Sequence, residues 1–591
     1  MKILTIHADF IEFQAKKKAF KNAEEGINEE RQRIEECLVI FTAVEKVDEG
    51  NPEAVVERYL QEIKNVVQQL SVKNIVLYPY AHLSSNLSSH KIAENIMKDA
   101  EKKLAAENKL NVYRAPFGWY KTFNIQTKGH PMSELSREFN VGSADQETND
   151  STKAAKESDN LVEEVDMDNL LKKMSRVQMT APRGKNDQKS NVELGKELDL
   201  YFVSEIVGSG LPLFTPKGTT IKREIERFVT DEELKRGYLH TSTPIMAKSD
   251  LYKVSGHWQH YKDDMFSLNV GGETFALRPM TCPFQFIIYK HKSRSYRDLP
   301  IKYAEFADLF RNEKSGELRG LTRVRQFTLA DAHVICQPEK LEQEFEEVLD
   351  LLKFVMEKLG IKDIWYRFSK WDPENKGGKY IDNPEAWEES QITMKKILDK
   401  LGVEYIEKGG EAAFYGPKLD IQYKDIYGKE DTLITLQIDF ALPERYDLTY
   451  MDKDGKEKRP MVIHRSSSGA TERTISYLLE KYQGKLPLWL SPVQVQIVTV
   501  IEDVIPFAKE IESELIKNGI RVELDIRSES LGKKIRDAQM SKVNYILTIG
   551  EKEVEAKTIA VRDRNNENKF GVSVEDFVAQ LKEEVEKKEI K

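Results

Sequence analysis

The sequence contains few cysteines and no long apolar stretch. Only three of its 591 residues are cysteine, Cys37, Cys282 and Cys336, which is too few for a disulfide-stapled secreted protein. No run of about 18 apolar residues is present, so we expect no membrane-spanning helix. The opening residues from Met1 to His7 lack the apolar segment of a secretory signal. These absences favour a protein of the reducing cytoplasm that is not bound to a membrane.

The sequence also lacks an excess of positive charge. Its 99 acidic and 90 basic residues give a formal net charge of −9, which argues against a generally basic nucleic-acid binder of the histone kind. Nucleic acid is not excluded as a partner, because binding needs only a local basic surface. At about 150 residues per domain, the length predicts roughly four structural units.

The composition changes at three places along the chain. Residues 1–140 alternate strand-like and helix-like segments, as in a compact α/β domain. Residues 141–190 are acidic and poor in large apolar side chains, which predicts a flexible acidic linker with a short amphipathic helix over Met167–Met174. Residues 191–487 form the largest block, and residues 488–591 alternate strands with helices, which predicts a mostly parallel sheet. We therefore expect a multidomain chain of the α/β and α+β classes.

Three segments of the central block combine a regular element with residues suited to a site. In the first, a predicted helix over Thr220–Lys235 leads into a short predicted strand in the segment Leu239–Met246, which ends at Pro244. In the second, residues 304–313 and 322–333 read as two strands that carry arginines and carboxylates. In the third, residues 468–473 open a helix with a glycine and an arginine. Taken alone, arginines beside glutamates are most often surface ion pairs.

These three segments, in this order, resemble the three motifs of class II aminoacyl-tRNA synthetases. Shorter strings resemble threonyl-tRNA synthetases in particular, and the resemblance covers residues 191–587. The resemblance implies a class II catalytic core built on an antiparallel sheet. The strings are Ser255-Gly-His-Trp258, Arg278-Pro-Met-Thr-Cys-Pro283, Phe310-Arg-Asn-Glu313, Asp331-Ala-His333, Ala413-Phe-Tyr-Gly-Pro-Lys418 and Val462-Ile-His-Arg465.

The chemistry of amino-acid activation explains why arginines belong in such a site. A carboxylate attacks the α-phosphate of ATP, so positive charge must hold two anions together, and a planar guanidinium grips either anion with two bonds. The resemblance implies that Arg311 bridges the carboxylate and the α-phosphate. It implies that Arg473 holds the γ-phosphate at a helix start, and that Arg323 shares the remaining charge with Mg²⁺. The implied catalytic residues are Arg311, Arg473, Arg323 and Lys418, and the implied threonine- or ATP-binding residues are Glu313, Asp331, Tyr415, Gln437 and His257.

Cys282, His333 and His464 form a second candidate group. One thiolate and two imidazoles suit Zn²⁺ and leave a fourth position open for substrate, but the three residues lie far apart in the sequence. On the residues alone, core histidines and a cysteine packed as a small hydrophobe are the more common interpretation. The resemblance implies one Zn²⁺ per subunit, held by these three residues.

A zinc site would solve the problem of telling threonine from valine. An apolar pocket separates such near-isosteres by only about 10²-fold, whereas a metal can bind the amino group and the side-chain hydroxyl together, with Asp331 accepting from the hydroxyl. Serine keeps both groups, so a separate editing step is expected.

The sequence departs from bacterial members at Leu329, where they commonly carry glutamine. The resemblance therefore assigns no role to the wall of the site near Leu329.

Residues 1–140 resemble the N-terminal domain of archaeal threonyl-tRNA synthetases, which is similar to D-aminoacyl-tRNA deacylases. The His-x-x-x-His signature of the bacterial editing domain is absent from the sequence. Ester hydrolysis needs a positioned water and a stabilised oxyanion, and the alternative is a structural docking domain with ordinary polar loops. The strings are Tyr80-Ala-His-Leu-Ser-Ser85, Ala115-Pro-Phe-Gly-Trp-Tyr-Lys121 and His130-Pro-Met-Ser-Glu134, and the implied editing residues are His82, Tyr120, Lys121 and Glu134.

Residues 488–591 resemble the anticodon-binding domain shared by several class II synthetases. Donors and acceptors in such a domain read the exposed edges of unpaired bases. Arg527, Arg536, Glu553 and Arg562 match family positions that contact the anticodon. At Ser528, bacterial members often carry asparagine, and the alternative for each arginine is a solvated helix face.

Together the resemblances predict a threonine–tRNA ligase with editing in the same chain. Its partners would be tRNA(Thr), threonine and ATP, and it would form a homodimer because the first motif usually builds the dimer interface. Two alternatives stay open. One is another class II specificity, prolyl or seryl, and the other is a non-catalytic class II paralogue that binds tRNA.

Overall fold

The chain divides into two units, residues 1–153 and 154–591. The computed structural model describes residues 1–139 except 21, 22, 29, 71, 85, 107–109 and 129–132, then 171, 173, 174, 181–374 and 380–590, without the side chains of 136 and 138. Most of the predicted linker 141–190 and of the predicted helix over Met167–Met174 therefore lies outside the described residues, as does His130 with its two following neighbours.

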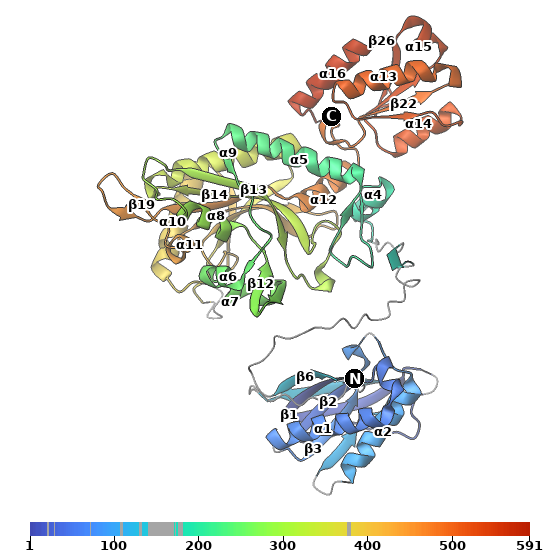
Figure 1. Cartoon of the computed structure of the whole chain (residues 1–591), viewed down its shortest axis with the longest axis vertical. Helices are drawn as coiled ribbons and strands as arrows, with labels where there is room; N and C mark the ends of the chain where they lie inside the picture. The colour runs from blue at the N-terminus through green and yellow to red at the C-terminus, as the bar shows by residue number, and fades with distance from the viewer. Residues whose placement is uncertain are drawn as a thin grey trace. The chain divides into compact units, whose positions relative to one another are not determined.

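The N-terminal unit is a six-stranded sheet with two helices on one face (Figure 1). The strand order is β4-β3-β2-β1-β5, with β6 also paired to β1, and β2, β3 and β4 run parallel. The elements are β1 (Lys2–Lys18), β2 (Gln32–Ala43), α1 (Pro52–Leu70), β3 (Asn74–Pro79), α2 (His90–Ala105), β4 (Asn111–Arg114), β5 (Trp119–Thr127) and β6 (Glu134–Glu138).

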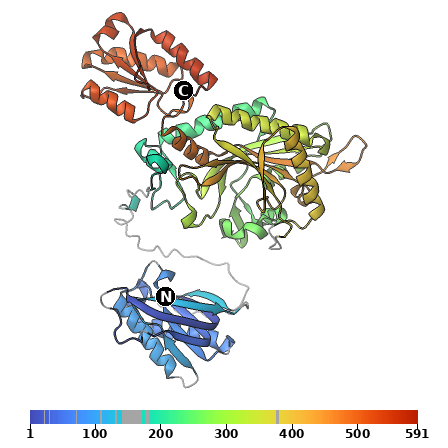
Figure 2. The ribbon, with the colours of Figure 1, turned by 180° about the vertical axis from the view of Figure 1, so that it is seen from behind.

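The two faces of this sheet carry different side chains. Tyr59 of α1 and Ile96 of α2 pack with Leu38 and other aliphatic residues on the helix-covered face. The other face, seen in Figure 2, carries an aromatic group in which the rings of Phe41 and Tyr78 lie 5.0 Å apart. Because side chains alternate along a strand, one sheet provides both an aliphatic core and an aromatic surface for a site.

The second unit is built on an eight-stranded sheet with the order β16-β15-β17-β18-β21-β14-β13-β9. All neighbouring strands are antiparallel except β13/β9 and β15/β16, which confirms the predicted antiparallel core. The strands are β9 (Leu239–His240), β13 (Ile301–Phe310), β14 (Gln326–Cys336), β15 (Ile364–Lys370), β16 (Tyr405–Gly409), β17 (Lys418–Lys424), β18 (Glu430–Asp439) and β21 (Met461–Ala470).

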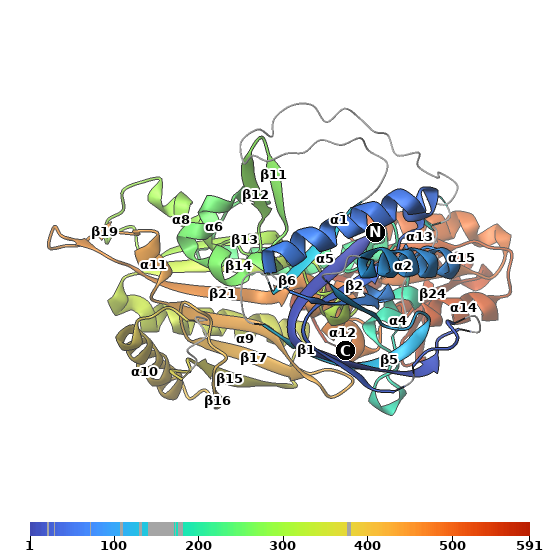
Figure 3. The ribbon, with the colours of Figure 1, turned by 90° about the horizontal axis from the view of Figure 1, so that it is seen from below.

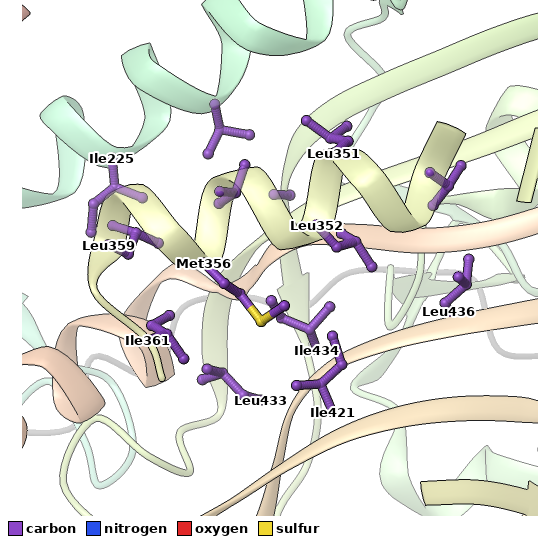
Figure 4. Close-up of a cluster of buried hydrophobic side chains, with 14 of the residues drawn as sticks. Ile225, Leu351, Leu352, Met356, Leu359, Ile361, Ile421, Leu433, Ile434 and Leu436 are labelled. Carbon is purple, nitrogen blue, oxygen red and sulfur yellow. The ribbon is translucent and has the colours of Figure 1, made fainter. Parts of the chain in front are cut away.

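Helices α5 (Pro216–Lys235), α9 (Leu341–Leu359) and α12 (Thr471–Tyr482) cover one face of this sheet. Apolar residues recur on α9 every three or four positions, which gives a continuous buried stripe. Figure 4 shows Leu352, Met356 and Leu359 of α9 packed between Ile225 of α5 and Ile434 of β18. Since this face is fully occupied by the core, the opposite face is the one available for a site.

The strand predicted from Leu239 to Pro244 is wrong in its extent. Only Leu239 and His240 pair, as β9, and the chain then leaves the sheet. Pro244 has no N–H to donate, and the backbone N–H of Thr243 donates to the Glu305 carboxylate at 3.2 Å instead of to a strand. The chain enters a small three-stranded sheet that lies beside α6 (Ser249–Ser255) in Figures 1 and 3, made of β10 (Met246–Lys248), β11 (Ser267–Val270) and β12 (Glu273–Leu277).

The last hundred residues form a five-stranded sheet of order β23-β22-β24-β25-β26. The predicted mostly parallel sheet is half wrong, because β24/β25 and β25/β26 are antiparallel. The short connection after β24 leaves no room for the dozen or more residues that a parallel crossover needs. The elements are β22 (Val495–Thr499), α13 (Ile505–Lys517), β23 (Val522–Asp525), α14 (Leu531–Met540), β24 (Tyr545–Ile549), α15 (Glu551–Ala556), β25 (Ile559–Asp563), β26 (Asn568–Val572) and α16 (Val574–Lys587).

None of the helices in the described ranges has the length and apolar character that crossing a bilayer requires.

Candidate functional site

A cavity opens on the face of the large sheet that the helices leave free. Its walls come from β14, β18, β21, the start of α8 (Cys282–Lys290) and the start of α12. Lys418 is absent from the described lining, because its ammonium lies 3.3 Å from the Asp420 carboxylate on β17. The cavity brings together all the other predicted catalytic, substrate and metal residues, which are Arg311, Arg323, Arg473, Glu313, Asp331, Tyr415, Gln437, His257, Cys282, His333 and His464.

Strand alternation explains this gathering. On β14, Ala330 and Ala332 pack into the helix-covered core, whereas Asp331 and His333 line the cavity. β14 pairs with β21 so that His333 lies opposite His464. Residues that are far apart in the sequence are therefore neighbours across one antiparallel ladder.

Arg311 presents a free cation to the cavity. Its guanidinium lies over the ring of Phe327, 5.0 Å from the ring centre, and donates no hydrogen bond to any described residue. The side chain is exposed in the cavity, and an arginine stays charged at neutral pH. The arrangement is suited to an incoming anion.

Arg473 and Arg323 are held differently from Arg311. The Arg473 guanidinium donates to the carbonyl oxygens of Thr322 and Thr432, at 3.1 and 2.6 Å. Arg323 donates to the Glu313 carboxylate at 2.8 Å and lies 3.1 Å from the carboxylate of Glu317. The resemblance implies that Glu313 accepts from the adenine amino group and that Arg323 shares phosphate charge, but the two side chains are bound to each other here.

Cys282, His333 and His464 come together as the sequence resemblance implies. Their potential ligand atoms lie within 4.8 Å of one another, and all three residues are buried. Burial lowers the pKa of His333, which keeps its imidazole neutral, and raises the pKa of the Cys282 thiol. Neutral imidazoles are the form that binds a metal, and a bound metal would remove the thiol proton.

Two residues that sequence reasoning missed fix which imidazole nitrogens face the group. Nδ1 of His333 donates to the amide oxygen of Gln285 at 2.5 Å, and Nε2 of His464 donates to the carboxylate of Asp439 at 2.7 Å. The Gln285 amide is itself oriented, since its nitrogen donates to the Thr241 hydroxyl at 2.9 Å. Lone pairs remain on Nε2 of His333 and Nδ1 of His464, and such outer partners orient metal ligands. This donor set fits Zn²⁺.

The remaining predicted substrate residues surround this group. The Tyr415 hydroxyl donates to the amide oxygen of Gln437, and its ring centre lies 4.9 Å from that of His464. His257 is buried, and burial lowers its pKa to about 3, so its ring is neutral. Burial also raises the pKa of Asp331, the predicted acceptor for a substrate hydroxyl. Leu329, the position where the sequence departs from bacterial relatives, faces Ala470 across the sheet and gives the cavity an apolar wall.

The N-terminal unit contains a separate cavity on its aromatic face. His82, Tyr120 and Lys121 line it, whereas Glu134 lies exposed on β6 and is absent from the described lining. The Lys121 ammonium donates to the carbonyl oxygens of Pro116 and Trp119, at 2.8 and 3.2 Å. Burial lowers the pKa of Lys121 to about 8.

The four predicted anticodon residues differ in whether their side chains are bonded to other residues of the domain. Arg527 is bound to the carboxylates of Asp525 and Asp537, at 2.6 and 2.8 Å. Glu553 accepts from the backbone N–H of Gly550 and caps its own helix. The side chains of Arg536 and Arg562 have no hydrogen bond or ion pair within the part of the chain that the structure describes.

Three parts of the chain match known protein families. Residues 1–139 match the family described as the Archaea-specific editing domain of threonyl-tRNA synthetase. Residues 264–482 match the tRNA synthetase class II core domain (G, H, P, S and T), and residues 494–584 match the anticodon binding domain.

Individual curated relatives are named threonine–tRNA ligases. A threonine–tRNA ligase of Clostridium perfringens (strain SM101) is 54% identical over 401 residues, covering 67% of this chain and 62% of its own length. One from Exiguobacterium is 47% identical over 399 residues, with 67% and 62% covered. The chain thus spans less than two thirds of these curated relatives. The crystal structure of the RNA binding domain of threonyl-tRNA synthetase from Cryptosporidium parvum has a TM-score of 0.64 and 35% identity, covering 67% of this chain and 98% of that one.

Proposed function

The chain belongs to the threonyl-tRNA synthetase family, and we propose that it joins threonine to tRNA(Thr) and removes serine wrongly attached to that tRNA. Threonine would first react with ATP and Mg²⁺ to give threonyl-adenylate and diphosphate, and the threonyl group would then pass to the tRNA. We assign editing to residues 1–140, a linker to 141–190, catalysis to 191–487 and anticodon binding to 488–591.

One observation carries the catalytic proposal. The same cavity contains the free guanidinium of Arg311 and the buried group of Cys282, His333 and His464. The cation would hold the carboxylate and α-phosphate of the reacting pair in line, which neutralises charge and fixes geometry. Arg473, at the start of α12, would hold the γ-phosphate.

The buried group would provide amino-acid selectivity. Zn²⁺ held by Cys282, His333 and His464 would offer its open position to the amino group and hydroxyl of threonine. Asp331 would accept from that hydroxyl, and Tyr415 with Gln437 would close the pocket around the bound amino acid. Valine lacks the hydroxyl and loses the contacts made to it, whereas serine keeps both the amino group and the hydroxyl, so this mode of selection requires an editing site.

Exposed apolar residues support the proposed homodimer. Leu234 at the end of α5 and Leu239 of β9 expose 54% and 56% of their surfaces, on the segment that resembles the first class II motif. A second copy of the chain would cover them. We place the assembly in the cytoplasm, with tRNA(Thr) as its macromolecular partner.

Pyrophosphate exchange is the test of this function. With zinc-loaded protein, we expect rapid exchange with threonine, slower exchange with serine and almost none with valine or proline. Fastest exchange with proline or serine would instead assign another class II specificity. No exchange with any amino acid would assign a non-catalytic paralogue, an alternative that the retention of Arg311, Glu313 and Arg473 argues against.

Editing should depend on a charged Lys121. Burial lowers the pKa of Lys121 to about 8, with Arg114 adding to the effect and Glu24 opposing it. The ammonium form dominates below that pH, so hydrolysis of seryl-tRNA(Thr) should fall as the pH rises through about 8. Lys121→Met should slow single-turnover hydrolysis by roughly 10²-fold at pH 7, while threonine-dependent pyrophosphate exchange stays unchanged.

Lys128 offers a matched control for this measurement. Its ammonium is bound to Asp9 and Glu36, at 2.7 and 2.9 Å, and it does not line the cavity. Lys128→Met should therefore edit at the wild-type rate after subtraction of spontaneous ester hydrolysis. A wild-type rate that rises through pH 8 would identify Lys121 as a base, and unchanged hydrolysis by Lys121→Met would remove it from the site.

A further inference from the structure

Phe570 on β26 exposes 77% of its surface, more than any other large hydrophobic side chain among the described residues. A single exposed hydrophobic residue is common on protein surfaces and needs no explanation by itself. Phe570 differs because the backbone around it is built to turn the ring outward, and because two cations without partners lie on the same face of the domain.

A β-bulge sets the direction of Phe570. Ile559 pairs with Val572, and Val561 pairs with Lys569, so Phe570 and Gly571 together oppose a single residue of β25, Ala560. Gly571 has φ +67°, the left-handed conformation that glycine adopts in this kind of bulge. Bulges redirect side chains at sheet edges, so the exposure of the ring follows from a specific backbone feature.

Strand pairing identifies the face on which Phe570 lies. Ile559 and Val561 point into the core covered by α13 and α16. Ala560 and Arg562, which alternate with them, therefore face the α14 side, as does Phe570 opposite Ala560. Arg562 also lies opposite Ile546, which packs with α14.

Helix α14 extends this surface. The Gln539 side chain donates to the amide oxygen of Asn566 at 2.6 Å, which ties the end of α14 to the loop between β25 and β26. Arg536 and Met540 lie on the exposed side of α14, and Met540 exposes 68% of its surface. The α14 side of the domain therefore combines Arg536, Arg562, Met540 and Phe570.

We propose that Phe570 is a stacking platform for an unpaired base of the tRNA anticodon loop, beside Arg562. An aromatic ring offers stacking to a base of any identity, and adjacent guanidinium groups hold phosphates or base edges. Arg536 and Arg562 have no ion pair with any described residue, so their charge is available to RNA. The surface lies within residues 494–584, which match the anticodon binding domain, and the inference rests on the proposed function.

The test compares Phe570→Ala and Phe570→Trp in the full chain. The probe is a tRNA(Thr) transcript that carries 2-aminopurine at one anticodon-loop position at a time. Stacking quenches this fluorophore, so we expect quenching at one position by the wild type and Phe570→Trp, and none there by Phe570→Ala. The alanine variant should also raise the Kd for tRNA by about 5- to 100-fold.

Ile516→Ala is the matched control, because Ile516 exposes 57% of its surface on α13 of the opposite face. It should bind tRNA as the wild type does. Unchanged quenching and an unchanged Kd in Phe570→Ala would overturn the platform. A raised Kd together with loss of threonine-dependent pyrophosphate exchange would also overturn it, because that combination indicates unfolding. A wild type that neither exchanges pyrophosphate nor binds tRNA would overturn the proposed function together with the platform.

Discussion

Arg311→Ala is expected to slow threonyl-adenylate formation by roughly 10³-fold or more, the effect of removing an arginine that stabilises phosphoryl charge in a transition state. Arg311 is suited to such a role because its guanidinium faces the cavity and has no hydrogen-bond partner among the described residues. Removing it breaks no side-chain hydrogen bond or ion pair among the described residues, so the loss should appear in kcat for pyrophosphate exchange and not in stability. The tRNA Kd should stay unchanged, since anticodon binding is assigned to another domain.

Arg297→Ala provides the matched control for Arg311→Ala. Arg297 also contacts an aromatic ring, with its guanidinium 5.5 Å from the ring centre of Tyr296, but it does not line the cavity. It should exchange pyrophosphate at the wild-type rate. Retained activation by Arg311→Ala would show that another cation bridges the two anions, and Arg473 would be the first candidate.

The pairing of Arg323 with Glu313 has a consequence for ATP binding. If Glu313 accepts from the adenine amino group and Arg323 holds phosphate, both must release each other when ATP enters. Glu317, 3.1 Å from Arg323, adds a second carboxylate to this pair. Glu313 and Arg323, the two residues of this loop proposed to bind ATP, thus neutralise each other in the structure, whereas the Arg311 guanidinium has no such partner among the described residues.

Much of the fold follows from local patterns in the sequence. The runs Asn74–Pro79 and Tyr545–Ile549 are rich in aliphatic and aromatic residues. These patterns predict two strands, and β3 and β24 have the same bounds. The strands β5 and β26 were missed because their residues are mostly exposed and give no apolar alternation. The strand predicted from Leu239 to Pro244 is longer than the observed β9, since Thr243 bonds to the Glu305 carboxylate and not to a neighbouring strand.

The sequence predicts site residues only where the residue types themselves resemble a family motif. Resemblance brought Cys282, His333 and His464 together, but nothing in the sequence connects Asp439 with His464, whose contact depends on the pairing of β18 with β21. Gln285 has a weak local signal, because it lies three positions after Cys282 on one helix. Conversely, Arg527 and Glu553 match anticodon positions and yet are bound within their own domain. Their proposed contacts with RNA would require those bonds to open.

Cys282→Ala is expected to remove zinc from the protein and to abolish the preference for threonine over valine. Two imidazoles alone leave the metal without its thiolate, and the three ligand atoms that now lie within 4.8 Å are reduced to two. Metal content measured after dialysis should fall from one zinc per chain to near zero. The threonine-to-valine ratio of kcat/KM should then fall to about one or below, because an apolar pocket without the metal does not favour the hydroxyl, with threonine activation itself greatly slowed.

Cys336→Ala separates loss of the metal from loss of a buried thiol. Cys336 is fully buried on β14, the strand that also carries His333, but it packs in the core and is not part of the metal group. Both substitutions delete one sulfur atom from the interior, so their costs in stability should be similar, whereas only Cys282→Ala should lose zinc.

Asp439→Asn adds an intermediate case. It keeps all three ligands but removes the carboxylate that accepts from His464, so zinc affinity should fall by about 10- to 100-fold. Full zinc content in Cys282→Ala would show that these residues do not hold the metal, and the explanation of threonine selectivity would fall with it.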